Sequence, residues 1–247
     1  MVLYFVGLGL GDEKDISIRG LEIVKKCDYV YLESYTSAMQ RNLKELAAFY
    51  GKPVMEANRI LVEQRAEEIL KKAKEGNVAF LVVGDPFGAT THIDLRLRAQ
   101  KEGINVKVIH NASIINAVGE IGLELYKYGK VTSIPFDNMK IASPYEVFLN
   151  NQKMGLHTLF LLDLDPSKNK FMSIIEGIDY LLKNGLDPKQ TCVGIAGLGQ
   201  EGQEIKTFSA AGAFKEHFTK RPQCLIVPGK LHFVEEEALK IWKAQLN

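Results

Sequence analysis

Hydrophobic and polar positions follow two alternating periods along the first 110 residues. Short runs rich in Val, Ile, Leu and Phe are separated by segments whose apolar residues recur every three or four positions. The runs predict strands at residues 1–7, 28–33, 52–57, 77–85 and 104–111. The segments between them predict helices over 16–27, 39–50, 59–76 and 92–103, the third ending at Gly76 as a C′ glycine. Strands alternating with helices predict a parallel sheet covered on both faces.

The second half of the chain has a more varied pattern. It predicts helices over 113–123, 144–155 and 171–184, with a polar loop at 166–170. Strands are expected at 129–136, 156–164, 190–199 and 204–210, followed by a last strand, loop and helix over 222–246. The pair 190–210 is typical of an antiparallel hairpin, which would make this sheet mixed.

These patterns predict an α/β protein of two domains in tandem. We place the N-terminal domain, with a parallel sheet, at residues 1–111 and the C-terminal domain, with a mixed sheet, at 112–247. Ligands of open α/β sheets bind beyond the carboxyl ends of the strands. A cleft between the two domains is therefore the expected ligand site.

Composition narrows the class of protein. The 247 residues are 46% hydrophobic and 25% charged, with a net charge of +1, so we expect a globular protein without direct binding to nucleic acid. The three cysteines are far apart and the five histidines are scattered, which predicts neither a disulfide framework nor a metal site. No apolar run is long enough for a membrane span and no signal peptide is recognisable, so a cytoplasmic location is expected.

A glycine turn, "VGLGLGDEKD", follows the first predicted strand. Gly7, Gly9 and Gly11 allow unusual backbone angles and close approach of a ligand. Glu33 lies at the position of a ribose-binding acid in a dinucleotide fold. However, the acidic residues 12, 13 and 15 would repel a diphosphate and tolerate a ligand with a positive centre. A structural turn with a solvated acidic tail is the alternative.

Two further motifs follow strands of the first domain. In "GDPFGATTH", Asp85 and Gly88 are the better ligand candidates, whereas Thr90 or Thr91 is expected to cap the next helix. In "HNASI", Ser113 offers a hydrogen bond or, taken alone, an N-cap. Later strand ends, "LFLLDLDP" and "GIAGLG", offer apolar walls for an adenine, and "VPGKLHF" places His232 in a loop between strand and helix.

Together, "VGLGLGDEKDIS", "GDPFGATTH", "IHNASIINAVG" and "PGKLHFVE" resemble the signature segments of the diphthine synthases. These enzymes are methyltransferases of the tetrapyrrole methylase-like superfamily, and the resemblance extends over most of the chain, including "YVYLESYTS" and "GLHTLFLLDL". It implies successive methylation, by S-adenosylmethionine, of the amino group of a 3-amino-3-carboxypropyl-histidine in translation elongation factor 2. The product is diphthine or, in eukaryotic-type enzymes, its methyl ester.

The resemblance also implies a set of cofactor contacts and an assembly. The family's cofactor lies folded in the interdomain cleft, and S-adenosylhomocysteine is the product that leaves it. A homodimer is expected, and no catalytic base is identified. The positions that match family cofactor contacts are Leu10, Asp85, Gly88, Ser113, Ile114, Leu162, Leu198 and His232.

Three other functions remain alternatives. A tetrapyrrole methylase would use the same chemistry on a uroporphyrinogen or precorrin. A nicotinamide-dependent oxidoreductase would use the glycine turn with Glu33. A non-catalytic partner of the translation machinery would bind the cofactor without turnover. Methylation of each acceptor, and protection by NAD against thermal unfolding, distinguish these alternatives.

Overall fold

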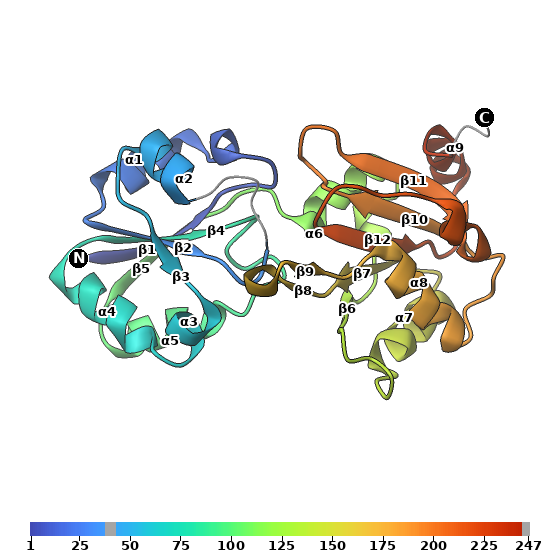
Figure 1. The fold of residues 1–247 in the computed structure, drawn as a ribbon, viewed down its shortest axis with the longest axis horizontal. Coiled ribbons are helices and arrows are strands. Elements are labelled where there is room, and N and C mark those ends of the chain that lie inside the picture. The colour runs from blue at the N-terminus through green and yellow to red at the C-terminus, as the bar shows by residue number, and fades with distance from the viewer. Residues whose placement is uncertain (38–42, 244–247) are drawn as a thin grey trace. The chain divides into compact units, whose positions relative to one another are not determined.

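The computed structural model describes residues 1–37 and 43–243, which fall into two units, Met1–Ile115 and Asn116–Asn247. The first unit has a five-stranded sheet in the order β3-β2-β4-β1-β5, with every neighbouring pair parallel (Figure 1). Its strands are β1 (Val2–Gly7), β2 (Tyr29–Glu33), β3 (Met55–Ala57), β4 (Val78–Val82) and β5 (Asn105–Ile109). The predicted parallel sheet is confirmed.

Helices cover both faces of this sheet (Figure 1). They are α1 (Ile18–Lys26), α2 (Leu43–Tyr50), α3 (Arg59–Glu63), α4 (Ala66–Glu75) and α5 (Ile93–Lys101). Successive strand residues point to opposite faces, so Phe80 packs with α3, α4 and α5, while its neighbour Leu81 packs with α1 and α2. Two separate cores result, one on each face.

The prediction of a single long helix over 59–76 is wrong, because the helix is interrupted at residues 64 and 65, between α3 and α4. The N–H groups of Gln64 and Arg65 both donate to the Ile60 carbonyl, which ends the first helix. Both helices bury apolar residues in the same core, including Val62 and Ile69, so the apolar spacing continues across the break. The start of the helix predicted at residue 39 lies outside the described residues.

Gly76 ends α4 in an extended conformation, with φ −161° and ψ −175°, so it is not the left-handed C′ glycine that we predicted. Glycine is needed here because the Asp28 side chain occupies the space that a Cβ would take. A Cβ at Gly76 would lie 2.6 Å from the Asp28 carboxylate, which accepts a hydrogen bond from the Asn77 N–H.

The second unit contains a mixed sheet in the order β11-β10-β12-β7-β6. Among its described strand pairs only β6 and β7 are parallel, which confirms the predicted mixed sheet and the hairpin of β10 and β11. Figure 1 shows α7 and α8 side by side along this sheet, and both contribute to one core. The strands are β6 (Thr132–Ile134), β7 (Thr158–Leu162), β10 (Thr191–Ala196), β11 (Glu204–Ser209) and β12 (Gln223–Val227). The helices are α6 (Ile114–Ala117), which crosses the boundary between the units, α7 (Ser143–Lys153), α8 (Ile174–Lys183) and α9 (Phe233–Ile241).

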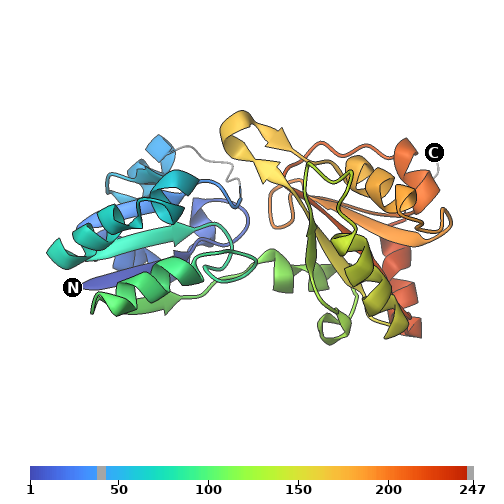
Figure 2. The same ribbon diagram turned by 90° about the horizontal axis from the view of Figure 1, so that it is seen from below.

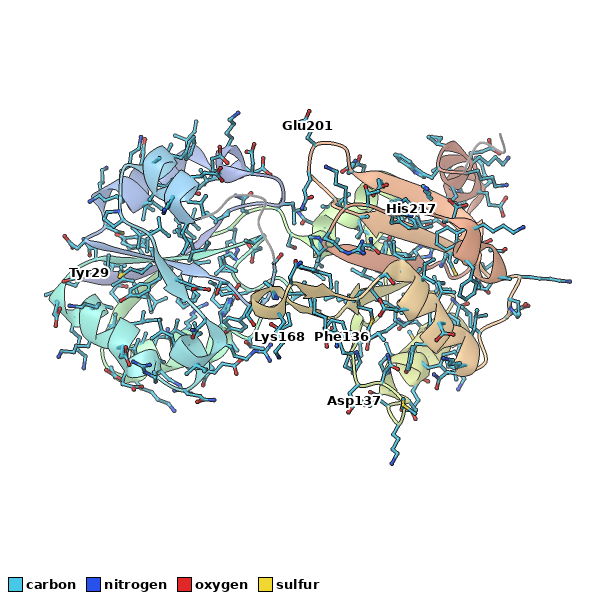
Figure 3. All side chains as sticks on the ribbon, in the orientation of Figure 1. Tyr29, Phe136, Asp137, Lys168, Glu201 and His217 are labelled. Atoms are coloured by element: carbon cyan, nitrogen blue, oxygen red, sulfur yellow. The ribbon has the colours of Figure 1, made fainter. Side chains whose placement is uncertain are left out.

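Two predictions for this half need correction. The helix expected over 113–123 is short, since α6 gives way to a 3₁₀ turn at Val118–Ile121 that ends at Gly122 with φ +91°. The loop expected at 166–170 is the turn of a small hairpin of β8 (Leu164–Asp165) and β9 (Lys170–Phe171), which projects from the second unit (Figure 2). Figure 3 shows Lys168 at this turn, and the Lys170 ammonium lies 3.9 Å from the centre of the Phe136 ring.

Cys27, Cys192 and Cys224 are all buried and carry free thiols. Among the described residues there is no helix with the length and hydropathy needed to cross a membrane.

Candidate active site at the carboxyl edge of the parallel sheet

The loops that follow β1 and β4 are joined through two glycines. Gly9 and Gly84 exchange backbone hydrogen bonds of 3.3 and 2.7 Å, and their φ angles are +79° and +81°. Such angles favour glycine strongly over residues with a Cβ. The strand order explains the contact, because β4 and β1 are neighbours and both end at this edge. The glycine turn therefore lies at the edge where open α/β sheets bind ligands, with Gly7, Gly9 and Gly11 buried and Leu10 half-buried.

The acidic tail of the glycine turn folds back on it. Asp15 Oδ2 accepts a 2.7 Å hydrogen bond from the Gly11 N–H, and Asp12 Oδ1 accepts one of 2.8 Å from the Lys14 N–H. Glu13 is buried. The alternative of a solvated tail therefore does not describe Glu13, whereas Lys14 and Asp15 are exposed. A turn whose amides already serve its own carboxylates is a poor phosphate site.

Asp85 is fixed by several donors at the end of β4. Its Oδ1 accepts from the Phe87 N–H at 2.9 Å, while Oδ2 accepts from the Asn111 N–H at 3.2 Å and lies 2.8 Å from His110 Nδ1. Burial alone would raise the pKa of Asp85, but these hydrogen bonds together hold it below the ordinary value of 3.8. The carboxylate is therefore anionic at neutral pH.

The "GDPFG" and "HNASI" motifs pack directly against each other. A Cβ at Gly88 would lie 2.8 Å from Ser113 Oγ, so a side chain there would meet Ser113 first. The Asn111 amide donates to the carbonyls of Gly7 and Asp15, at 3.0 and 2.9 Å, and joins both motifs to the glycine turn. Ala89 has a φ of +63°, a strained backbone of the kind that gathers at ligand sites.

Five of the predicted cofactor residues lie in the first unit, four in these loops and Ile114 at the first residue of α6. Leu10 and Ile114 are half-buried, Ser113 is buried, and Asp85 and Gly88 follow β4. The adjacent order β4-β1-β5 brings their three loops to one edge. Their binding role stays a prediction.

The predicted threonine cap of α5 is wrong. Thr90 Oγ1 donates to the Pro86 carbonyl at 2.5 Å, and the N-cap position belongs to His92, without a side-chain capping bond. The tight turn after Pro86 provides a nearer acceptor for the Thr90 hydroxyl.

Glu33 has a structural role that conflicts with binding a ribose. It is buried at the end of β2, where Oε1 accepts from the N–H groups of Tyr35 and Thr36 at 2.5 and 2.6 Å. Oε2 accepts from the Thr36 hydroxyl at 2.5 Å. Both carboxylate oxygens therefore hold the turn after β2, which removes the feature that favoured a nicotinamide cofactor.

The second unit separates its three predicted residues. β7 and β10 both run antiparallel to β12, so Leu162 and Leu198 lie at the end of the sheet where β12 begins, and both are buried. His232 follows the opposite end of β12. The structure therefore brings Leu162 and Leu198 to one end of the sheet and leaves His232 at the other.

A buried ionic network anchors the His232 loop. Glu235 accepts from the His232 N–H at 2.8 Å and from the Glu124 N–H at 3.0 Å, and it forms an ion pair with Lys127. It also lies 2.9 Å from His157 Nε2, whose other nitrogen accepts from the Gly229 N–H at 3.0 Å. This network was not predicted from the sequence. A glutamate at the third position of a helix was the one available signal.

Comparison with known proteins identifies the family of the chain. Residues 2–212 match the model of the family described as Tetrapyrrole (Corrin/Porphyrin) Methylases. The chain is 43% identical to the "Probable diphthine methyl ester synthase" of Arabidopsis thaliana, with 98% of each chain covered. It is 41% identical to the "Diphthine methyl ester synthase" of Homo sapiens, covering 100% of this chain and 96% of the relative. A solved structure titled "Crystal structure of diphthine synthase" superposes with a TM-score of 0.92 at 36% identity, covering 98% of this chain and 96% of that one.

Proposed function

Because the chain belongs to the tetrapyrrole (corrin/porphyrin) methylase family, we propose that it is a methyltransferase of diphthamide biosynthesis. The observation that carries the proposal is the similarity to diphthine methyl ester synthases along nearly the whole length of both chains. This similarity confirms the resemblance found in the sequence motifs.

The proposed methyl donor is S-adenosylmethionine, whose sulfonium supplies an activated methyl group. The residues present fit this cofactor. Leu10 is half-buried in the glycine turn, and the Asp85 carboxylate suits a ligand with positive charge or hydroxyl groups. In the proposal, the donor contacts Leu10, Asp85, Gly88, Ser113 and Ile114 in the first unit, and Leu162, Leu198 and His232 in the second.

The proposed acceptor is the 3-amino-3-carboxypropyl group on a histidine of translation elongation factor 2. Its amino group receives methyl groups in succession to give diphthine. The names of the relatives support a further methyl ester on the neighbouring carboxylate. Homodimer formation and a cytoplasmic location, which the resemblance implied, belong to the same proposal.

A reconstituted reaction tests this function. The protein is incubated with S-adenosylmethionine and with elongation factor 2 that carries the unmethylated side chain. The mass of the intact substrate is then measured by mass spectrometry. We expect mass steps of one methylene per methyl group. Mild alkaline hydrolysis should remove one step if an ester has formed. An unchanged mass with protein that binds the donor in calorimetry would contradict the proposal.

The family description favours one second candidate, methylation of a tetrapyrrole. The same assay with uroporphyrinogen or a precorrin as acceptor separates the two. We expect no methyl incorporation into the macrocycle.

A further inference from the structure

A histidine and an aspartate form a close pair at the candidate site. His110 Nδ1 lies 2.8 Å from Asp85 Oδ2. The His110 side chain is 71% exposed, whereas that of Asp85 is 14% exposed. One end of the pair is thus fixed inside the protein, and the other end is open to an incoming molecule.

The surroundings hold this pair in place. Asp85 accepts two backbone hydrogen bonds in addition to its contact with His110, from Phe87 and Asn111. Asn111, next to His110 in the chain, is tied by its amide to the carbonyls of Gly7 and Asp15. The imidazole therefore has a fixed backbone on one side and a fixed carboxylate on the other.

The charge of Asp85 determines which nitrogen of His110 carries the proton. An ionised carboxylate only accepts hydrogen bonds, and the lowered pKa of Asp85 keeps it ionised. In neutral His110 the proton therefore lies on Nδ1, and Nε2 presents a free lone pair. Asp15, whose backbone carbonyl accepts from the Asn111 amide, uses its carboxylate to accept from the Gly11 N–H. Histidine oriented in this way by a carboxylate is the arrangement of a general base.

We propose that His110 is the general base that takes a proton from the acceptor amine, with Asp85 as its positioning residue. The inference rests on the proposed function, because it assigns the acceptor amine to the open side of this pair.

Proton removal precedes each transfer of a methyl group to the amine. The acceptor amine arrives as an ammonium, which has no lone pair for attack, and gives one proton to His110 Nε2. The amine nitrogen then bonds to the methyl carbon while the methyl–sulfur bond breaks, and that bond's electron pair remains on sulfur. His110 passes its proton to solvent before the next round. Each methylation of the amine therefore needs one proton removal.

Ester formation makes a different demand. A carboxylate is already deprotonated at neutral pH and carries the lone pair that attacks. A general base therefore contributes to methylation of nitrogen but not to methylation of the carboxylate oxygen. The two reactions at one acceptor provide an internal control.

The test variant is His110→Asn, because the asparagine amide keeps a donor for Asp85 but has no basic nitrogen. We expect amine methylation at pH 7 to slow by about 100-fold, the lower end of the range for general bases. Ester formation on a substrate whose amine is already trimethylated should stay within about twofold, as should calorimetric affinity for S-adenosylhomocysteine. The pH profile of the amine methylation rate should also differ in shape between His110→Asn and wild type.

His217→Asn is the matched control, since His217 is an exposed histidine of the second unit (Figure 3). We expect wild-type rates for both reactions. A second readout does not depend on turnover. Nitrogen-15 NMR of the histidine rings should show the signal of an Nδ1-protonated imidazole that disappears in His110→Asn and remains in His217→Asn.

Unchanged amine methylation in His110→Asn would overturn the inference, and so would an Nε2-protonated His110. Equal slowing of both reactions would also overturn it, because a base for nitrogen does not act on the carboxylate. If wild type methylates neither group, the proposed function itself fails, and that result is distinct from the others.

Discussion

At Gly9, two separate constraints act on one residue. Its φ of +79° lies in the left-handed region, and an added Cβ would lie 2.6 Å from the Asp15 Cβ. Asp15 cannot move away freely, because its carboxylate accepts from the Gly11 N–H and its carbonyl accepts from Asn111. Glycine is therefore required at position 9 for two reasons: the left-handed backbone angle, and the lack of space for a Cβ beside Asp15.

Gly9→Ala should lower the free energy of unfolding by roughly 3 kcal/mol, the sum of backbone strain and the forced movement of Asp15. Urea denaturation measures this change. Gly51→Ala is the control, because Gly51 has a φ of +66° with nothing within 4 Å of an added Cβ. It should cost only about 1 kcal/mol. Equal losses would show that Asp15 adapts without cost.

At the level of single elements, the start of α9 is fixed by a buried carboxylate. Burial alone would raise the pKa of Glu235, but four donors lower it to about 2. Burial also lowers the pKa of His157, which favours its neutral form even beside Glu235. One donor, His232, is the N-cap of the same helix, and the other three come from distant parts of the chain and are Lys127, Glu124 and His157. One side chain thus connects the helix to the loop before it and to two earlier segments.

Glu235→Gln should destabilise the protein by about 3 kcal/mol near neutral pH, because it leaves Lys127 without its buried counter-ion. A carboxylate whose folded pKa is lowered stabilises the fold above its unfolded pKa and loses that contribution as pH falls toward the folded value. In wild type, the Glu235 contribution should therefore decline between about pH 5 and pH 2. Urea denaturation across this range should show a weaker pH dependence in the variant. A parallel pH dependence would contradict the assignment.

The sequence predicted the central strands well because their signal is local. Runs such as "VAFLVV" are buried on both faces in β4, and this burial is what a continuous apolar run encodes. The break between α3 and α4 carries no such signal, since neither glycine nor proline marks it. The β8–β9 hairpin has strands of two residues each, too short for a period to appear.

The candidate site was predictable to the extent that its residues follow strands. Asp85 and Ser113 come directly after strong strands, so their place at one edge follows from parallel topology. The pairing of His110 with Asp85 depends on the side-by-side order of strands in the sheet, which residue spacing does not encode. The position of His232 depends likewise on the antiparallel direction of β12.

At the level of the whole molecule, each unit has cores of its own. Phe80 belongs to a core of the first unit and Phe160 to the core of the second, and both are fully buried. The only tryptophan, Trp242, lies in the second unit, where its indole N–H donates to the Ile121 carbonyl. Tryptophan fluorescence therefore reports on the second unit alone, whereas far-UV circular dichroism reports on both.

Phe80→Ala should cost about 3–5 kcal/mol in the first unit. We expect the circular dichroism transition in urea to begin earlier, while the midpoint of tryptophan fluorescence stays unchanged. Phe160→Ala is the reciprocal control and should shift the fluorescence midpoint. A common shift of both signals in both variants would show that the units unfold as one cooperative system.

The three buried cysteines give the protein built-in chemical reporters. Burial raises the pKa of Cys27 to about 11 and those of Cys192 and Cys224 to about 12, and only the thiolate reacts readily with maleimides. Native protein should therefore label very slowly. Modification of Cys27 would time the opening of the first unit, and modification of the other two would time the opening of the second. Because the native thiols react slowly, a fluorophore should attach selectively to a single introduced thiol, such as that of K168C on the exposed hairpin turn. No native cysteine needs to be removed.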